Sequence, residues 1–174
     1  MGNIKSLRRR ILALFFTALV LIAGLALNLS CDSITYGITE YAIPTTQSVP
    51  GGITAGPDGA VWFSEEFANK IGRITTGGEI TEYTIPTAKS IPNGITSGPD
   101  GALWFCENQS SKVVRMTTNG RITEYKTPTQ KMMEKDATIF GSFPTHITSG
   151  PKNTLWFTEN VANKIGRIGE KASR

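Results

Sequence analysis

The sequence predicts an all-β fold built from a repeated unit of four short strands. Nearly the same words recur in residues 50–83, 92–125 and 144–168, and Trp62 and Trp104 lie 42 residues apart. A fixed period of about 40–45 residues is typical of propellers, in which each blade has four strands. Gly and Pro recur in every unit and no helical apolar period is present. We therefore predict a partial β-propeller of three four-stranded antiparallel blades.

The first 31 residues have a different composition from the repeats. Lys5 and the three arginines at 8–10 precede an apolar run at residues 11–27. A basic segment followed by an apolar run is typical of an export signal. The run is long for a signal peptide and short for a membrane span. Residues 1–31 are therefore predicted to be a signal peptide or a membrane anchor, and residues 32–174 to be the repeat domain.

Cys31 is a candidate lipidation site. The words Leu29-Ser30-Cys31 resemble the lipobox of bacterial lipoproteins, although Asn28 stands where that motif usually has Leu. Cleavage after Ala26 is the competing interpretation. We expect an exported protein of the periplasm or cell envelope, associated with the membrane through a lipid or an N-terminal anchor.

The charge of the chain is concentrated in this leader. Of 18 Lys and Arg residues, four lie in residues 1–31, whereas all 14 Asp and Glu residues lie in residues 32–174. The repeat domain is therefore close to neutral, which argues against nucleic acid as a partner. Cys106 is its one cysteine, so no disulfide framework is expected.

Strands can be placed within the second unit in chain order. Residues 94–97 and 102–106 are predicted to be the first two strands, joined by the tight turn G-P-D-G. Residues 112–116 and 121–126 are predicted to be the third and fourth strands, joined by an Asn-Gly turn. The ten residues by which the third unit is delayed fall within 126–143, where we expect a connecting loop.

Residues 38–41 read I-T-E-Y, which is the wording of a fourth strand without a blade before it. The third unit has only its first three strands, so the predicted strand count is one, four, four and three. In a closed propeller the first strand would complete the last blade. Three blades cannot close by themselves, since propellers typically have four to eight. A homodimer that completes the propeller by exchanging these strands is therefore one expectation, and a shortened chain is the other.

The repeat words resemble those of the streptogramin B lyase family, also called virginiamycin B lyases. The matching words are G-I-T-x-G-P-D-G-A-[VL]-W-F-x-E, N-K-I-G-R-I-T and G-x-I-T-E-Y-x-I-P-T, at residues 52–65, 69–75 and 78–87. The resemblance covers nearly all of residues 38–168. It implies a seven-bladed propeller that opens the ester ring of cyclic depsipeptide antibiotics by elimination, with Mg²⁺ and a histidine as general base.

The resemblance also implies where the general base would lie. The family places it at the x of one P-x-G-I-T word, with an acidic metal ligand just before that Pro. Here the x positions hold Gly51, Asn93 and Thr145, and the residues before Pro are Val49, Ile91 and Phe143. The one histidine, His146, lies one place later, and a shift of one residue turns a strand side chain to the other face.

The glutamates of the W-F-x-E words do match the resemblance. They are Glu65, Glu107 and Glu159. Carboxylates that face one channel are suitable ligands for Mg²⁺, which prefers oxygen. The alternative interpretation is that each glutamate is a repeat residue that bonds loop amides. The tryptophans of the same words, Trp62, Trp104 and Trp156, are predicted to be core residues.

Two functions follow as hypotheses. The first is a shortened, non-catalytic binding or assembly module, with a small cyclic peptide or another ligand at the propeller face. The second is an active Mg²⁺-dependent carbon–oxygen lyase, in which Glu65, Glu107 or Glu159 holds the metal ion and His146 is the base.

Overall fold

The computed structural model describes residues 36–129, 132–134, 137–139 and 141–169. The chain divides into two compact units, residues 1–40 and 41–174, and all of the described strands lie in the second unit. The predicted leader and Cys31 lie outside the described residues. Within the described part of the chain, no helix is long and apolar enough to cross a membrane.

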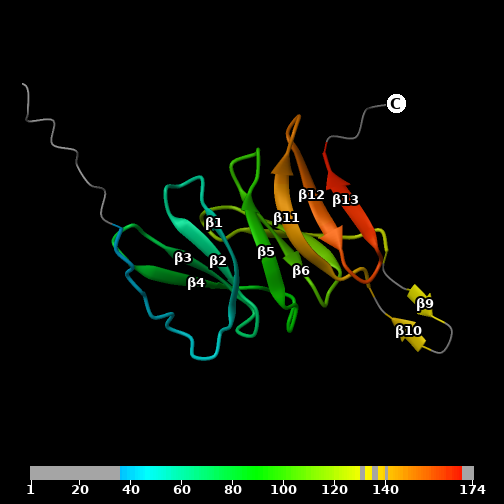
Figure 1. The fold of residues 1–174 in the computed structure, drawn as a ribbon, viewed down its shortest axis with the longest axis horizontal. Coiled ribbons are helices and arrows are strands. Elements are labelled where there is room, and N and C mark those ends of the chain that lie inside the picture. Colours follow the sequence, from blue (N-terminus) through cyan, green and yellow to red (C-terminus); the bar gives the residue numbers. More distant parts are fainter. Residues whose placement is uncertain (1–35, 130–131, 135–136, 140, 170–174) are drawn as a thin grey trace, which may run out of the picture. The chain divides into compact units, whose positions relative to one another are not determined.

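Three of the four antiparallel sheets in the described residues are the predicted blades (Figure 1). The first blade consists of β1 (Pro50–Ala55), β2 (Val61–Glu65), β3 (Lys70–Ile74) and β4 (Ile80–Thr84). The second consists of β5 (Pro92–Ser97), β6 (Leu103–Glu107), β7 (Lys112–Met116) and β8 (Ile122–Lys126). The third consists of β11 (Pro144–Gly150), β12 (Thr154–Glu159) and β13 (Lys164–Ile168). In each sheet the strands follow one another in chain order.

The segment between the second and third blades is not a plain loop. It contains a small hairpin of β9 (Met132–Glu134) and β10 (Ala137–Ile139), which pairs as a separate two-stranded sheet.

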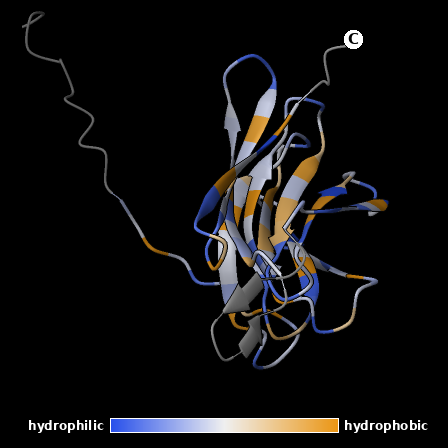
Figure 2. Ribbon diagram, turned by 90° about the vertical axis from the view of Figure 1, so that its right-hand side faces the viewer, coloured by the Kyte–Doolittle hydropathy of each residue, from blue (hydrophilic) through white to orange (hydrophobic). Residues whose placement is uncertain are grey.

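The hydrophobic core lies between the blades. The first strands of neighbouring blades lie side by side, β1 next to β5 and β5 next to β11 (Figure 1). One cluster combines Trp62 and Ile71 of the first blade with Ile95 and Phe105 of the second. The next combines Trp104 and Val113 of the second blade with side chains of the third, among them Ile147, Leu155 and Phe157. Figure 2 shows the hydrophobic residues mainly on the strands and many hydrophilic residues in the turns.

The buried tryptophans are fixed by the G-P-D-G turns. Asp58 accepts a hydrogen bond from the Trp62 indole at 2.9 Å and another from Arg73 at 2.7 Å. Asp100 receives the same bonds from Trp104 and Arg115 in the second blade. The third unit has Lys152 in place of Asp58 and Asp100, so its turn has no carboxylate to accept these two hydrogen bonds.

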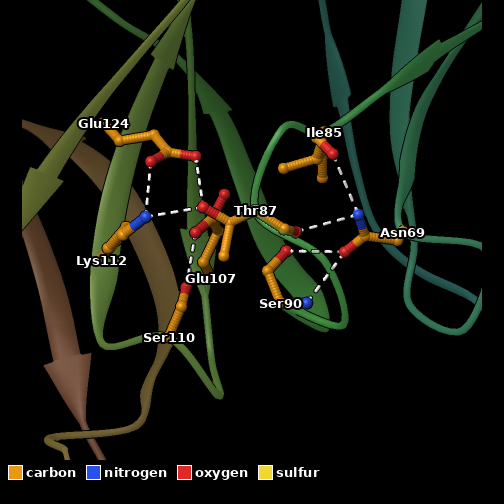
Figure 3. A network of polar contacts seen from close by, with 8 residues as sticks. All are labelled: Asn69, Ile85, Thr87, Ser90, Glu107, Ser110, Lys112 and Glu124. Carbon is orange, nitrogen blue, oxygen red and sulfur yellow. Dashed lines mark hydrogen bonds and ion pairs between the residues drawn. The ribbon is translucent and has the colours of Figure 1, made fainter.

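A network of hydrogen bonds joins consecutive blades (Figure 3). The Asn69 side chain donates hydrogen bonds to the carbonyl oxygens of Ile85 and Thr87 at 3.1 and 3.0 Å, and accepts two from Ser90. The Thr87 hydroxyl in turn receives a bond from Lys112 of the second blade. The connection from β4 to β5 is therefore held by both blades that it links.

In the single chain, residues 38–41 are not in a strand: the first described strand begins at Pro50, and Ile38 is 96% exposed. Their pairing with a third blade stays a prediction. One expectation about the tryptophans needs correction. Trp62 and Trp104 are buried core residues, whereas Trp156 is 37% exposed, because no described blade covers its face. Cys106 is fully buried, and this burial raises the pKa of its thiol far above the ordinary value.

Candidate functional site

The glutamates of the W-F-x-E words end the second strand of each blade. Glu65 pairs through its backbone with Pro50 of β1 and Lys70 of β3, and Glu107 and Glu159 hold the same register in their blades. Their exposed fractions are 0%, 0% and 4%. The matching words therefore place one buried carboxyl group at the same end of each blade.

These carboxyl groups are only partly hydrogen-bonded. Both carboxyl oxygens of Glu65 and one each of Glu107 and Glu159 have no hydrogen-bond partner. The other oxygen of Glu107 accepts a bond from the Ser110 hydroxyl (Figure 3). Buried polar atoms in proteins nearly always have a partner, so these oxygens need an explanation such as a proton, a water molecule or an ion.

Burial changes the acidity of two of these groups. Together with the nearby carboxylate of Glu82, burial raises the pKa of Glu65 to about 7. Burial also raises the pKa of Glu107 to about 7, against the hydrogen bond from Ser110. Glu124 behaves differently: its burial opposes ionisation, but the hydrogen bond from Lys112 holds its pKa below the ordinary value. The second blade thus contains one carboxyl group with a pKa near neutral pH, Glu107, and one ionised neighbour, Glu124.

The three glutamates do not form a common metal site. Within the described residues, no three side chains of His, Cys, Asp or Glu gather closely enough to hold a metal ion. Each glutamate lies in its own blade, next to the polar groups of that blade. The residues present in the described part of the chain therefore do not fit a shared Mg²⁺ ion.

The positions that the resemblance assigns to the base instead connect neighbouring blades. The Asn93 side chain donates a hydrogen bond to Glu66 of the preceding blade at 2.8 Å. The Thr145 hydroxyl accepts one from Asn108 at 3.3 Å. Gly51, the third of these positions, has no side chain. Two of the three positions therefore have a structural partner, and none carries a group that could take up a proton at neutral pH.

His146 lies in β11, at the position that Gly52 and Gly94 hold in the other blades. Its backbone amide donates to the Thr158 hydroxyl at 3.1 Å, as the amide of Gly52 donates to Ser64. Its side chain is exposed and lines an apolar groove of about 220 Å³ with Ile147, Trp156 and Ile165. This groove lies on the open face of the third blade, so His146 points away from the second blade.

One feature of this end of the blades could not be read from the sequence. The residue before each blade-starting proline has a positive φ, near 50° in all three repeats: Val49, Ile91 and Phe143. Such a conformation is unfavourable for branched and bulky residues and is often kept at functional sites. Here each of these residues accepts a backbone hydrogen bond at 3.1 Å, from Glu66, Asn108 and Asn160 respectively.

A cleft larger than the groove beside His146 lies elsewhere. This cleft of about 600 Å³ is lined by Asp100, Trp104, Thr154 and Arg167, among other residues. It lies near the turns that precede β6 and β12, which is the opposite end of these strands from Glu107 and Glu159. None of the predicted site residues lines it.

Solved structures and curated proteins with similar sequences agree on one family. A virginiamycin B lyase from Staphylococcus aureus is 48% identical, with a TM-score of 0.68, over 77% of this chain and 42% of its own. A structure titled streptogramin B lyase is 46% identical, with a TM-score of 0.67, over 76% of this chain and 41% of its own.

Curated sequences give shorter matches. The virginiamycin B lyases of Bacillus licheniformis and Saccharopolyspora erythraea are each 47% identical, over 43 and 45 residues, which is 15% of each. No protein-family model matches the chain. The chain thus spans about two fifths of the length of the solved lyases that it resembles.

Proposed function

Because the chain resembles the virginiamycin B lyases in both sequence and fold, we propose that it is a non-catalytic binding or assembly module made of lyase-type blades. The observation that carries this proposal is the use of the base positions. Asn93 and Thr145 bond the preceding blade, and Gly51 has no side chain. General-base catalysis contributes roughly 10²–10⁴-fold to rate, so a chain without it at this position loses a large part of the activity.

A ring-opening assay tests this proposal. The full chain is incubated with a streptogramin B antibiotic and Mg²⁺, and the linear product is measured by mass spectrometry. We expect no turnover above the uncatalysed rate. Calorimetric titration with the same cyclic peptide then tests binding separately from catalysis. Turnover that disappears in His146→Ala would overturn the proposal.

The second candidate is an active Mg²⁺-dependent carbon–oxygen lyase. The 46–48% identity to solved lyases and the exposed His146 favour it. In this alternative His146 is the base, and Glu65, Glu107 or Glu159 contributes to metal binding. It predicts turnover that requires Mg²⁺ and is lost in His146→Ala. Glu66→Gln, at a half-buried position without a proposed catalytic role, is the control.

For the N-terminus we propose export and attachment to the cell envelope, with lipidation at Cys31. The support is the basic and apolar leader and the L-S-C word. If Cys31 carries the lipid, the protein should partition into detergent, and Cys31→Ala should abolish this partitioning. Retention in the membrane after the change would indicate an uncleaved anchor.

A further inference from the structure

The fourth strand of a complete blade makes two contacts that recur. In the first blade, Tyr83 of β4 stacks on Trp62 with 5.4 Å between ring centroids, and Tyr125 stacks on Trp104 at 5.6 Å in the second. The residue before each tyrosine forms an ion pair with the third strand. Glu82 pairs with Lys70 at 2.8 Å, and Glu124 pairs with Lys112 at 2.5 Å. A fourth strand therefore brings one tyrosine and one carboxylate to each blade.

The third blade lacks these contacts in the described part of the chain. Trp156 and Ile165 are 37% and 64% exposed, whereas their counterparts in the first blade, Trp62 and Ile71, are fully buried. Lys164 donates a hydrogen bond to Thr129 at 3.0 Å, as Lys112 does to Thr87. Among residues 41–169 as described, however, Lys164 has no carboxylate partner. The open edge of β13 thus matches a strand that carries Glu followed by Tyr.

Residues 38–42 have the sequence of such a strand. They read I-T-E-Y-A, against I-T-E-Y-T in β4 and I-T-E-Y-K in β8. In the register of the complete blades, Tyr83 faces Ile71 and Ile80 faces Ile74. The same register on β13 places Tyr41 opposite Ile165, and Glu40 one residue away, on the side of the sheet where the complete blades form their ion pair.

Residues 41–45 contact the first blade in the same way as the segment after β4 contacts the second blade. The Tyr41 ring lies against Gly78 of the β3–β4 turn, as the Tyr83 ring lies against Gly120 of the next blade. The Thr45 hydroxyl accepts a bond from Lys70 at 2.7 Å and donates to Glu82 at 2.9 Å, the pattern that Thr87 forms with the second blade. Residues 41–45 therefore follow the path of a chain that leaves the fourth strand of a blade in front of β1.

The uncovered faces of the first and third blades carry side chains equivalent to those that pack together between the interior blades. Ile53 of the first blade is 68% exposed, whereas the equivalent Ile95 and Ile147 are buried at 6% and 8% against the preceding blade. The groove beside Trp156 and Ile165 is the face that receives such an isoleucine in the interior pairs.

His146 is the one departure from this pattern. It adds a side chain where Gly52 and Gly94 have none, and a Cβ on Gly94 would meet backbone atoms of β11. The incoming β1 must therefore lie farther from β11 than β5 does, with Gly51 where the other blades have Asn93 and Thr145.

We propose that a second copy of this chain docks on the open face of the third blade and completes it, with its residues 38–42 pairing along β13. The reciprocal contact gives a two-fold symmetric ring of six blades, within the range of known propellers. This inference rests on the proposed assembly function and names its partner. Its readout is mass rather than turnover, so failure of the two proposals can be distinguished.

A charge-reversal series tests the exchanged strand. The full chain is measured in detergent by light scattering after size-exclusion chromatography. We expect about twice the mass of the single processed chain, or twice 18.8 kDa if the leader is retained. Lys164→Glu and Glu40→Lys should each weaken dimerisation about tenfold or more, because like charges then meet across the contact. The double variant should restore it. A monomeric wild-type chain, or a double variant no better than the single ones, would overturn the proposal.

A mixing experiment tests the two faces. Ile53→Asp and Ile165→Asp each damage one face and leave the other intact, so each variant alone should be monomeric. An equimolar mixture should form a 1:1 heterodimer through the one intact contact, weaker than the wild-type ring, which uses two. Rescue on mixing also shows that both variants are folded. Phe67→Asp, at a turn residue that is 71% exposed, should dimerise like the wild type. Association that survives both face variants, or no heterodimer on mixing, would overturn the proposal.

Discussion

At the residue scale, the tryptophans of the second strands determine how well the blades pack. Trp104 is 6% exposed, stacks on Tyr125 and donates its indole N–H to Asp100 at 3.0 Å. Trp104→Ala would remove this packing and leave Asp100 with one partner fewer. We expect a loss of about 3–5 kcal/mol in the free energy of unfolding, measured by urea denaturation. Phe67→Ala, at an exposed side chain, should change it by less than about 0.5 kcal/mol. Equal effects of the two changes would contradict the placement of Trp104 in the core.

The buried carboxyl group of Glu107 should make the folded protein less stable as pH rises. Its pKa is raised from 4.5 to about 7 in the folded protein, so the folded state binds a proton more tightly than the unfolded state. The favourable contribution is full below about pH 4.5 and is lost as pH rises to about 7. The lowered pKa of Glu124 acts in the opposite sense, but only as pH falls below its ordinary range. Between pH 5 and 8 the free energy of unfolding should therefore decrease.

Glu107→Gln tests this pH dependence. A neutral amide keeps the acceptor for Ser110 and cannot ionise, so the variant should lose less stability than the wild type between pH 5 and 8. The measurement is the free energy of unfolding from urea titrations at several pH values. Glu79→Gln, at an exposed residue of the β3–β4 turn, is the matched control and should follow the wild type. If Glu107→Gln and the wild type have parallel pH profiles, the buried carboxyl group is not the source.

The sequence was sufficient to find these residues but not their surroundings. The repeat register identified the W-F-x-E glutamates, yet it suggested a channel, whereas they are buried within separate blades. It is also hard to predict from the sequence which face of the sheet a residue near the start of a first strand occupies. The ladder shifts between Pro144 and Ile147, and the same shift occurs in the other blades. Alternation of faces is interrupted at such an irregularity, so the orientation of His146 required the structure.

At the scale of elements, the first strands approach so closely that they require glycine. A Cβ atom on Gly94 would lie 2.7 Å from the backbone of Thr145 and His146 in β11. Because these are backbone atoms, the strands would have to separate. Gly94→Ala should therefore cost about 1–3 kcal/mol, measured as a lower melting temperature. Gly77→Ala is the control, since its nearest contact would be 3.7 Å away. Similar melting temperatures for the two variants would mean that β5 and β11 lie farther apart.

The regular strands could be predicted because each one is bounded by turn residues. The G-P-D-G and N-G words set the ends of β5 to β8 to within about two residues of the prediction. The β9–β10 hairpin could not be predicted in this way, since the inserted segment has no counterpart in the other units. The positive φ values of Val49, Ile91 and Phe143 were also inaccessible, because branched and aromatic residues rarely adopt them and nothing in their identity indicates it.

At the scale of the whole molecule, the three blades are alike in sequence but unequal in burial. The second blade is covered on both faces, while the first and third each leave one face open. An antiparallel sheet with an open apolar face and an unpaired edge tends to associate. The proposed two-chain ring covers both open faces of each chain and pairs the open edge of β13, by one contact that occurs twice.

Deletion of residues 38–41 tests this ring at its most specific element. Without the strand, β13 keeps an open edge and Trp156 lacks a tyrosine partner, so the variant should be monomeric where the wild type is a dimer. For a dimer, the melting temperature rises with protein concentration, because association is linked to folding. We expect that dependence in the wild type and none in the deletion variant, by calorimetry over a hundredfold range of concentration. Tyr36→Ala, just before the strand, should retain the dependence. A melting temperature independent of concentration in both proteins, with a monomeric mass, would mean that residues 38–41 do not join two chains.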